Sequence, residues 1–283
     1  MLTIVSWNIQ YGKGVDGHID LSRIAREILI DGFPDLICLQ EVSRNYPATD
    51  NGSDQVAELQ KLFPEYESFF GASHDRSGGF NGGRRQFGNL VLTRHSPIQV
   101  LHHLLPSPAD PKVKFMSRQT TELVIPTSSG AFRMMNTHLE FFSEKQNLSQ
   151  VQRIRELHEE ACIQYNEPGL DLPNTPLERV DRPEKMVICG DFNFTLDSVS
   201  YERMTSPLPD KIPDLFDAWN VVNPSENRSP TCGVFDHKQW KNGPHCRDYF
   251  FLSENFIQQI QTVSVNTDTN ASDHQPSRLI LKV

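Results

Sequence analysis

The sequence predicts an α/β protein in which two β-sheets pack face to face between flanking helices. Predicted strands outnumber predicted helices, and most of them are short and apolar. The chain of 283 residues is 37% hydrophobic, which is enough for a sizeable core. Neither an internal repeat nor a low-complexity tract divides it. We therefore expect residues 1–283 to form one domain.

The first quarter of the chain predicts alternating strands and helices. A strand over residues 2–8 ends at Asn8, and a second buried strand over residues 35–41 ends in Gln40-Glu41. Between them, Asp20 is a suitable N-cap for a helix that continues to residue 30, with apolar residues at helical spacing. A second helix is expected over residues 54–63, and another strand over residues 66–70.

The middle of the chain predicts further strands around one long helix. Residues 77–88 are rich in glycine and contain Arg84 and Arg85, which indicates a mobile exposed loop. Strands follow at residues 89–93 and 98–105, and a hairpin joins residues 119–125 to 132–137 across residues 128–130. A helix with one apolar stripe is expected over residues 147–165. The four prolines within residues 166–185 indicate a loop.

The stretch from Val187 to Asn193 is the clearest candidate for a central strand that ends at a functional site. Three apolar residues run into Gly190-Asp191-Phe192-Asn193, which predicts a buried strand that ends at a polar turn. Gly190 would let the backbone bend or let another group come close. Beyond this stretch we expect helices at residues 199–204 and 215–222, followed by strands at residues 247–253, 260–265 and 278–283.

Composition limits the classes of function. The 27 Lys and Arg residues are outnumbered by 36 Asp and Glu residues, giving a formal net charge of −9. This balance argues against a broad basic surface for nucleic acid, although it leaves room for a local basic patch. Five cysteines without a C-x-x-C pair favour a reducing, cytoplasmic setting. We expect no signal peptide and no membrane span, since the N-terminus enters a strand directly and apolar runs are short.

Polar residues collect at the ends of the predicted strands. Each has a simpler explanation on its own, such as a turn, a buried histidine, or an ion pair between Asp248 and Arg247. One active site would explain all of them: Asn8, Glu41, His138, Asp191, Asn193, Asp248, Asp273 and His274.

The chemistry of these side chains is mutually consistent. Carboxylate oxygens suit Mg²⁺ or Mn²⁺ better than zinc. A metal on Glu41 can polarise a phosphoryl oxygen, while Asp191 deprotonates a water that Asn193 helps to orient. An Asp-His pair supplies a histidine of fixed orientation, with either Asp273 or Asp248 as the orienting carboxylate.

Six short motifs together resemble the endonuclease/exonuclease/phosphatase superfamily, whose members include DNase I and exonuclease III-type repair nucleases. They occur in family order and span residues 6–274: Ser6-Trp7-Asn8, Leu39-Gln40-Glu41, Asn136-Thr137-His138, Gly190-Asp191-Phe192-Asn193, Arg247-Asp248-Tyr249 and Ser272-Asp273-His274. The resemblance implies a DNase I-like four-layer α/β/β/α sandwich. It also implies metal-dependent hydrolysis of a phosphoester by water, with Mg²⁺ as the cofactor and Mn²⁺ as a substitute.

The resemblance also implies roles for individual residues. Glu41 would bind the metal, helped by Asn8 and Asp273. Asp191 and Asn193 would position the attacking water. His274, oriented by Asp248, would contact the phosphate, as would His138, which stands where exonuclease III-type enzymes have a tyrosine. Arg118 resembles an arginine that reaches substrate phosphate, although a surface ion pair explains it equally well.

The expected substrate is a small or lipid-derived phosphoester in preference to duplex DNA, because few basic residues are left to follow a long backbone. The loop at residues 77–88 could close over a head group. Two alternatives remain: a DNA endonuclease or exonuclease of the repair type, and a non-catalytic binding module of the same fold. The intact set of motif carboxylates and histidines disfavours the second alternative. No obligate protein partner is indicated.

Overall fold

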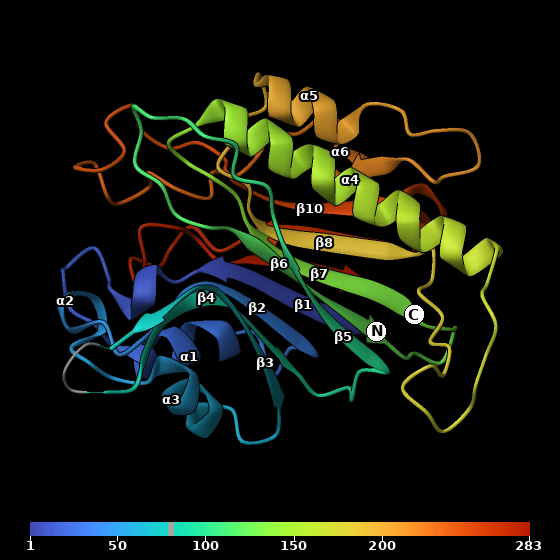
Figure 1. Cartoon of the computed structure of the whole chain (residues 1–283). Coiled ribbons are helices and arrows are strands. Elements are labelled where there is room, and N and C mark those ends of the chain that lie inside the picture. Colours follow the sequence, from blue (N-terminus) through green and yellow to red (C-terminus); the bar gives the residue numbers. More distant parts are fainter. Residues whose placement is uncertain (79–81) are drawn as a thin grey trace.

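Two β-sheets of six strands form the centre of the molecule (Figure 1). The computed structural model describes residues 1–78 and 82–283. The first sheet has the order β11 (Ile260–Val265), β12 (Ser277–Leu281), β1 (Leu2–Asn8), β2 (Leu36–Arg44), β4 (Arg84–Thr93) and β3 (Glu67–Ser77). The second has the order β5 (Gln99–Leu104), β6 (Gln119–Ile125), β7 (Phe132–His138), β8 (Met186–Asp191), β10 (Asp248–Ser253) and β9 (Leu215–Asp217).

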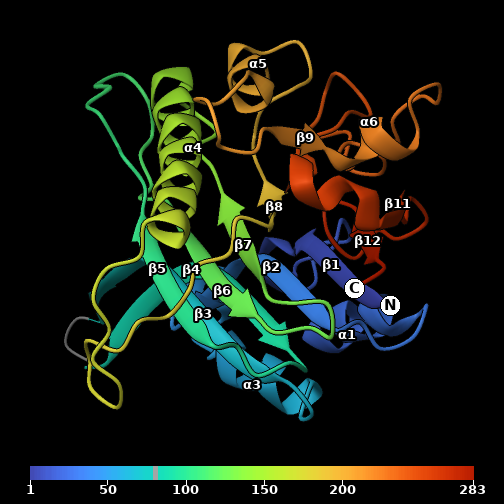
Figure 2. The same ribbon diagram turned by 90° about the vertical axis from the view of Figure 1, so that its right-hand side faces the viewer.

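Helices cover the outer face of each sheet. Helices α1 (Leu21–Leu29) and α3 (Gln55–Leu62) lie on the first sheet, and α4 (Glu144–Asn166) and α5 (Val199–Thr205) lie on the second (Figure 2). Shorter helical segments lie in the connections: η1 (Gln10–Gly12), α2 (Pro47–Asp50), α6 (Ala218–Val222) and η3 (Glu254–Gln259). The four layers confirm the predicted sandwich.

Three apolar clusters hold the four layers together. Leu2 and Ile4 of β1 belong to the cluster between the sheets, whereas Val5 and Trp7 pack beneath α1 and α3. In β8, Val187 and Cys189 face the other sheet, while Met186 and Ile188 face α4. Because side chains alternate along a strand, central strands buried on both faces read as continuous apolar runs. This explains why the runs in β1 and β8 could be recognised in the sequence.

Helix starts follow the expected capping chemistry. The side chain of Asp20 accepts a 2.9 Å hydrogen bond from the backbone N–H of Arg23 at the start of α1. Asp54 accepts a 3.1 Å bond from the backbone N–H of Ala57 at the start of α3. Each bond satisfies a donor that the first helical turn would otherwise leave free.

The expectation of a loop over residues 77–88 is wrong for residue 77 and for residues 84–88, which are strand. Strand β3 continues to Ser77 and β4 begins at Arg84, and these two residues face each other across the ribbon. Backbone pairing between two long strands overrides the local glycine content, which is the reason for the difference. The part of the predicted loop at residues 79–81 lies outside the described residues.

Three smaller corrections concern element boundaries. The predicted helix over 215–222 begins as β9, because Leu215–Asp217 pair with β10, and only Ala218–Val222 are helical. Helix α4 starts at Glu144, three residues before its predicted start, because Ser143 caps it. Strand β2 continues past Glu41 to Arg44 through an irregularity described below. Within the described residues, no helix combines the length and apolar character needed to cross a membrane.

Candidate active site

The ends of four strands bring the predicted polar residues to one edge of the two sheets. Asn8 ends β1, His138 ends β7 and Asp191 ends β8, while Asp248 begins β10. The register places Asp191 opposite both His138 and Asp248. Rigid strands therefore deliver three of these side chains side by side, and Asn8 approaches from the other sheet.

Glu41 reaches the site through a β-bulge. The pairing of β2 with β4 shifts register between Leu39 and Val42, and Glu41 in between has a left-handed backbone with φ of 59°. A non-glycine residue in this region is strained, and a bulge turns its side chain out of the regular alternation. The neighbouring Gln40 stays buried and donates a 2.7 Å bond from Nε2 to Asn136 Oδ1. The strained backbone at the bulge therefore sets the direction of the Glu41 side chain.

Gly190 allows β7 and β8 to approach closely. Its φ is 141°, and a Cβ atom at this position would overlap the backbone carbonyl of Thr137. Only glycine fits there. The turn after β8 is also constrained, since Asn193 has φ of 55° and its backbone N–H donates a 2.9 Å bond to Asp191 Oδ1. Of the two alternatives expected for Gly190, the close approach of another group is confirmed.

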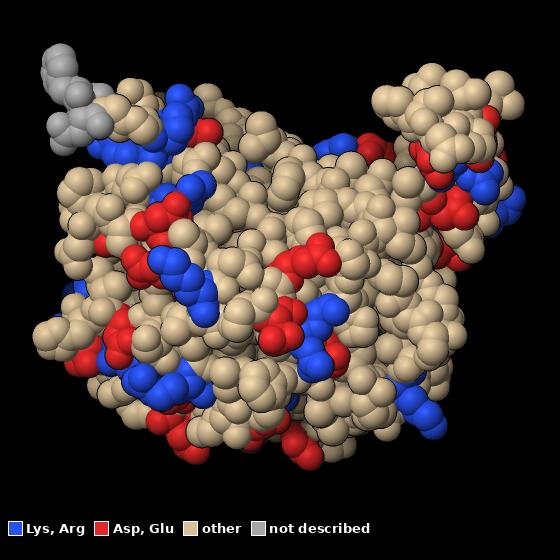
Figure 3. Space-filling view, turned by 90° about the horizontal axis from the view of Figure 1, so that it is seen from below, with Lys and Arg blue, Asp and Glu red and all other residues tan. Residues whose placement is uncertain are grey.

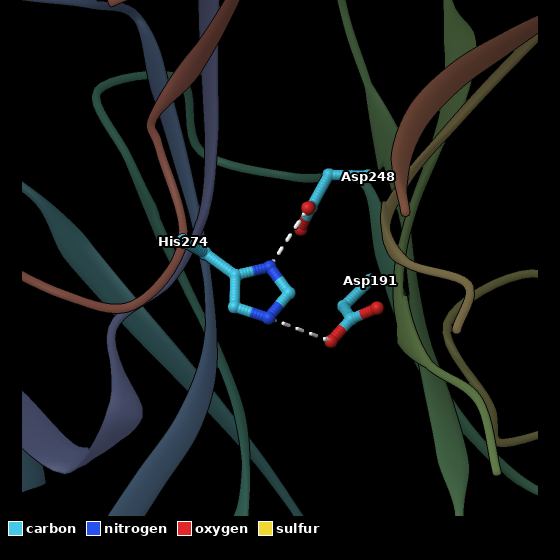
Figure 4. Close-up of side chains that lie close together, drawn as sticks. All are labelled: Asp191, Asp248 and His274. Carbon is cyan, nitrogen blue, oxygen red and sulfur yellow. Dashed lines mark hydrogen bonds and ion pairs between the residues drawn. The ribbon is translucent and has the colours of Figure 1, made fainter. Parts of the chain in front are cut away.

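His274 lies between two aspartates (Figure 4). Its Nδ1 lies 2.8 Å from Asp248 Oδ2, and its Nε2 lies 3.7 Å from Asp191 Oδ2. The loop that carries it is anchored to β1, because Trp7 Nε1 donates a 2.9 Å bond to the carbonyl of His274 and Ser272 Oγ donates a 2.8 Å bond to the carbonyl of Asn8. Of the two candidate orienting carboxylates, Asp248 occupies that position.

The charge state of this group follows from its surroundings. Burial opposes the charged imidazole, but the carboxylates of Asp248, Asp191 and Asp273 outweigh burial and raise the pKa of His274 well above its usual range. Burial raises the pKa of Asp248 to about 6, against the influence of His274. Burial acts to raise the pKa of Asp191, but the charge of His274 and other neighbours outweighs burial and lowers this pKa. Near neutral pH the group therefore holds an imidazolium and an ionised Asp191.

Asn8 connects the two halves of the site. Its Nδ2 donates a 3.1 Å bond to Glu41 Oε1 and a 3.0 Å bond to Asp191 Oδ2, and its Oδ1 accepts a 3.0 Å bond from the backbone N–H of Gln10. In this orientation the amide nitrogen, not the oxygen, faces the carboxylates.

His138 and Asn193 form the opposite wall. Asn193 Nδ2 lies 3.0 Å from His138 Nε2 and donates a further 3.0 Å bond to the carbonyl of Leu139. Burial, with help from the positive charge of Arg118, lowers the pKa of His138 to about 3. His138 is therefore neutral at physiological pH, and the amide donor assigns its acceptor role to Nε2.

The arrangement carries surplus negative charge, which fits a bound cation. Four carboxylates, those of Glu41, Asp191, Asp248 and Asp273, surround one imidazolium. Burial and the charge of Asp273 raise the pKa of Glu41 to about 7, and burial raises the pKa of Asp273. The Oδ1 atom of Asp248 is buried without a hydrogen-bond partner in the described residues. Oxygen donors of this kind suit a hard divalent ion.

Arg118 is not at the surface. It is 3% exposed, and its Nε lies 3.2 Å from Glu140 Oε2 in a buried ion pair, so the alternative of a surface pair is wrong. Its Nη1 is buried without a hydrogen-bond partner in the part of the chain that the structure describes. The guanidinium is close enough to influence the pKa values of both His138 and His74. An unpaired buried donor beside the site is suited to an anion.

Two further residues complete the site and were not identified from the sequence. Trp240 Nε1 donates a 3.3 Å bond to Asp273 Oδ2, and its ring centroid lies 5.7 Å from that of His274. The Arg247 guanidinium lies 5.1 Å from the centroid of the Trp240 ring and donates a 2.7 Å bond from Nη1 to the carbonyl of Asn193. Arg247 therefore contacts the backbone of Asn193 and the indole of Trp240. The sequence offered one indication of Trp240, namely a large aromatic residue in a segment that has no apolar periodicity to explain it as core.

Comparison with known proteins agrees with this geometry. The sequence model of the Endonuclease/Exonuclease/phosphatase family matches residues 5–274, so the chain belongs to this family of phosphoester hydrolases. It is 20% identical to an exodeoxyribonuclease of Bacillus subtilis (strain 168), with both chains fully covered.

Solved structures of the same family share the fold. An endonuclease/exonuclease/phosphatase from Beutenbergia cavernae DSM 12333 superposes with a TM-score of 0.70 at 21% identity, covering all of this chain and 71% of the other. A mannosyl-6-phosphatase from Bacteroides thetaiotaomicron VPI-5482 gives a TM-score of 0.67 at 16% identity, with both chains fully covered.

Proposed function

We propose that this protein is a divalent-metal-dependent hydrolase that cleaves a phosphoester by in-line attack of water. The observation that carries the proposal is the position of His274, which is held by Asp248 at Nδ1 while its Nε2 lies 3.7 Å from Asp191. That distance is too long for a direct hydrogen bond, so the Nε2 proton is available to a substrate oxygen.

The side chains divide the chemistry between them. His274 donates from Nε2 to a phosphoryl oxygen, where negative charge develops in the transition state. Asp191, kept ionised, accepts a proton from the attacking water, and Asn193 orients that water or the phosphate. The Nη1 of Arg118, which has no hydrogen-bond partner among the described residues, donates to a remaining phosphoryl oxygen. Neutral His138 donates to another from Nδ1–H, because its Nε2 accepts from Asn193.

Glu41 and Asp273 would hold the metal, because they supply oxygen donors whose pKa values are raised by burial and by neighbouring carboxylates, Asp273 acting on Glu41 and Asp191 on Asp273. Asn8 would add its amide oxygen only by turning over and giving up the bond from Gln10. When bound, Mg²⁺ or Mn²⁺ supplies positive charge that polarises the phosphoryl group and neutralises the leaving oxygen.

We further propose a small or lipid-derived phosphoester as the substrate. With a net charge of −9, the protein has few basic residues left to contact a long run of nucleic-acid phosphates. Acidic and basic side chains are interspersed over much of the face in Figure 3, with basic ones gathered beside the grey residues. The name of the mannosyl-6-phosphatase neighbour is consistent with a small substrate, whereas that of the exodeoxyribonuclease relative keeps DNA as the alternative. The five buried, unpaired cysteines suit a cytoplasmic location.

A substrate panel tests this proposal. The purified protein is assayed with Mg²⁺ on bis(p-nitrophenyl) phosphate, sugar phosphates, lipid phosphodiesters and abasic duplex DNA, each at two salt concentrations. We expect kcat/KM to be highest on a small or lipid substrate and nearly independent of salt. Efficient cleavage of DNA alone, falling steeply with salt, would identify a nuclease and contradict the proposed substrate class.

A further inference from the structure

A pocket of about 380 Å³ opens beside the end of β2, outside the group of carboxylates and histidines described above. Four of its eight lining residues are aromatic: Tyr11, Tyr46, Phe87 and Phe115. Arg76 and His74 also line it. An aromatic cavity with a few charged groups at its edge is typical of a site for a small organic ligand.

The pocket adjoins the residues proposed to hold the phosphate. In the pairing of β2 with β4, Phe87 faces Ser43, which lies two residues beyond Glu41. Tyr11 follows Asn8 by three residues, and burial together with the charges of Glu41 and Asp273 raises its pKa. A phosphate bound near Glu41 would therefore direct its organic group into this pocket.

The backbone that carries Tyr11 is strained. Gln10 and Tyr11 have φ values of 44° and 46°, so two successive non-glycine residues adopt left-handed conformations. The carbonyl of Tyr11 accepts a 2.7 Å bond from Gln55 Nε2, which helps to fix this turn. Strain of this kind persists only where surrounding structure enforces it, and it is common at binding sites. Here it presents the Tyr11 ring to the pocket.

Two arginines beside the pocket lack acidic partners. Arg76 and Arg85 face each other across the β3–β4 ribbon, and within residues 1–78 and 82–283 neither forms an ion pair with a carboxylate. Arg76 instead lies 3.3 Å from His74 through Nη2, and Arg85 lies 5.7 Å from the centroid of the Tyr46 ring. Like charges placed directly opposite each other destabilise a sheet. An anion bound between them would relieve this repulsion.

The neighbouring arginine provides a contrast. Arg84, on the same ribbon, is paired with Asp75 at 2.6 Å. Among the described residues of the ribbon, the arginines without a carboxylate partner are therefore the two next to the pocket.

We propose that this pocket binds the organic group of the substrate, and that this group is compact, aromatic or apolar, and carries a second anionic group that Arg76 and Arg85 contact. The inference rests on the proposed function, because it places the reacting phosphate at Glu41 and His274. It narrows the substrate class from phosphoesters in general to those with a ring-sized apolar body between two anionic groups.

Three non-hydrolysable phosphonates test the pocket: methylphosphonate, benzylphosphonate and 4-carboxybenzylphosphonate. Their dissociation constants are measured with Mg²⁺ by ligand-observed NMR, so the result does not depend on turnover. We expect benzylphosphonate to bind about tenfold more tightly than methylphosphonate, and the carboxylate to add about threefold more, as for burial of one ring and one exposed ion pair.

Two variants test which residues cause these increases in affinity. Phe115→Ala should reduce the benefit of the ring, and Arg76→Ser should remove only the benefit of the carboxylate. Both side chains are exposed, so folding is not at risk. Arg84→Ser serves as the matched control and should change none of the three affinities.

The outcomes separate the two proposals. If methylphosphonate binds, bis(p-nitrophenyl) phosphate is hydrolysed, and all three phosphonates bind equally, the pocket inference alone is overturned. If no phosphonate binds and no phosphoester is hydrolysed, the proposed function fails and the pocket inference fails with it. Graded affinities that respond to the two variants but not to Arg84→Ser support the inference.

Discussion

The indole nitrogen of Trp240 lies 3.3 Å from Asp273 Oδ2, so a residue from an irregular segment holds a carboxylate that we assign to the metal. Replacing Trp240 by Phe keeps a ring beside His274 but removes this donor. We expect the Mg²⁺ concentration for half-maximal activity to rise about threefold to tenfold, as for the loss of one hydrogen bond of ordinary strength, because the 3.3 Å distance is long. The rate at saturating Mg²⁺ should change by less than about twofold.

Trp219→Phe is the control for that measurement, because the indole nitrogen of Trp219 has no hydrogen-bond partner within the described residues. A Mg²⁺ titration of both variants distinguishes positioning of Asp273 from a general loss of packing. Equal titration curves for Trp240→Phe and the wild type would contradict the role of the indole.

The pKa of Glu41 predicts how the metal-free protein responds to pH. Burial and Asp273 raise this pKa from 4.5 to about 7, so between these values the folded protein holds a proton that the unfolded chain releases. Folding is therefore linked to proton uptake, and stability falls as pH rises through this window. Relative to Glu41→Gln, wild-type protein in chelator should lose about 3 kcal/mol of unfolding free energy from pH 4.5 to 7, where one pKa unit corresponds to about 1.4 kcal/mol.

Mg²⁺ should reverse this loss, because the ion binds the deprotonated carboxylate. Urea unfolding across the pH range, with and without Mg²⁺, provides the measurement. Parallel profiles for the wild type and Glu41→Gln would show that Glu41 does not carry the raised pKa.

Gly190→Ala should destabilise the protein by about 3 kcal/mol or more, since the new methyl group would overlap the backbone of Thr137. Gly130→Ala is the matched control, because Gly130 also has positive φ but no atom of the described residues lies within 4 Å of the position that a Cβ would take there. It should cost about 1 kcal/mol from backbone strain alone. Thermal unfolding of both variants tests the prediction, and similar losses would show that close approach of β7 and β8 is not the constraint.

Arg118→Lys keeps the positive charge but loses the second nitrogen of the planar guanidinium. Because Nη1 has no hydrogen-bond partner in the part of the chain that the structure describes, we expect KM to rise about tenfold with kcat changed less. The pair of Arg153 with Glu160 on α4 offers a control, Arg153→Lys, away from the site. If steady-state kinetics show an unchanged KM for Arg118→Lys, Arg118 serves only to pair with Glu140.

Much of the site could be predicted because its residues end buried strands, whose apolar runs are visible in the sequence. Asn8 and Asp191 follow such runs directly, and they converge because the two sheets pack with the ends of β1 and β8 on the same side. The bulge at Glu41 could not be predicted, because it depends on the register between β2 and β4. Nothing local marks a shift in long-range pairing.

The β3–β4 ribbon and the Trp240 contact show the same limit. Arg84 and Arg85 lie in a glycine-rich stretch that favours a loop, yet they are strand residues because β3 pairs with them. Trp240 reaches Asp273 from 33 positions earlier in the chain, through a segment without regular periodicity. In both cases, tertiary contacts decide a structure that local propensity does not encode.

The most direct test of the account is the turnover of bis(p-nitrophenyl) phosphate with Mg²⁺ by Asp191→Ala, His274→Ala and the double variant. We expect each single variant to lower kcat by about 10²-fold or more, and the double variant to lose less than the product of the two, because the pair acts as a unit. His102→Ala, which alters an exposed histidine on β5, should keep wild-type turnover, and chelator should abolish activity throughout. Near-wild-type kcat in either single variant would contradict the mechanism.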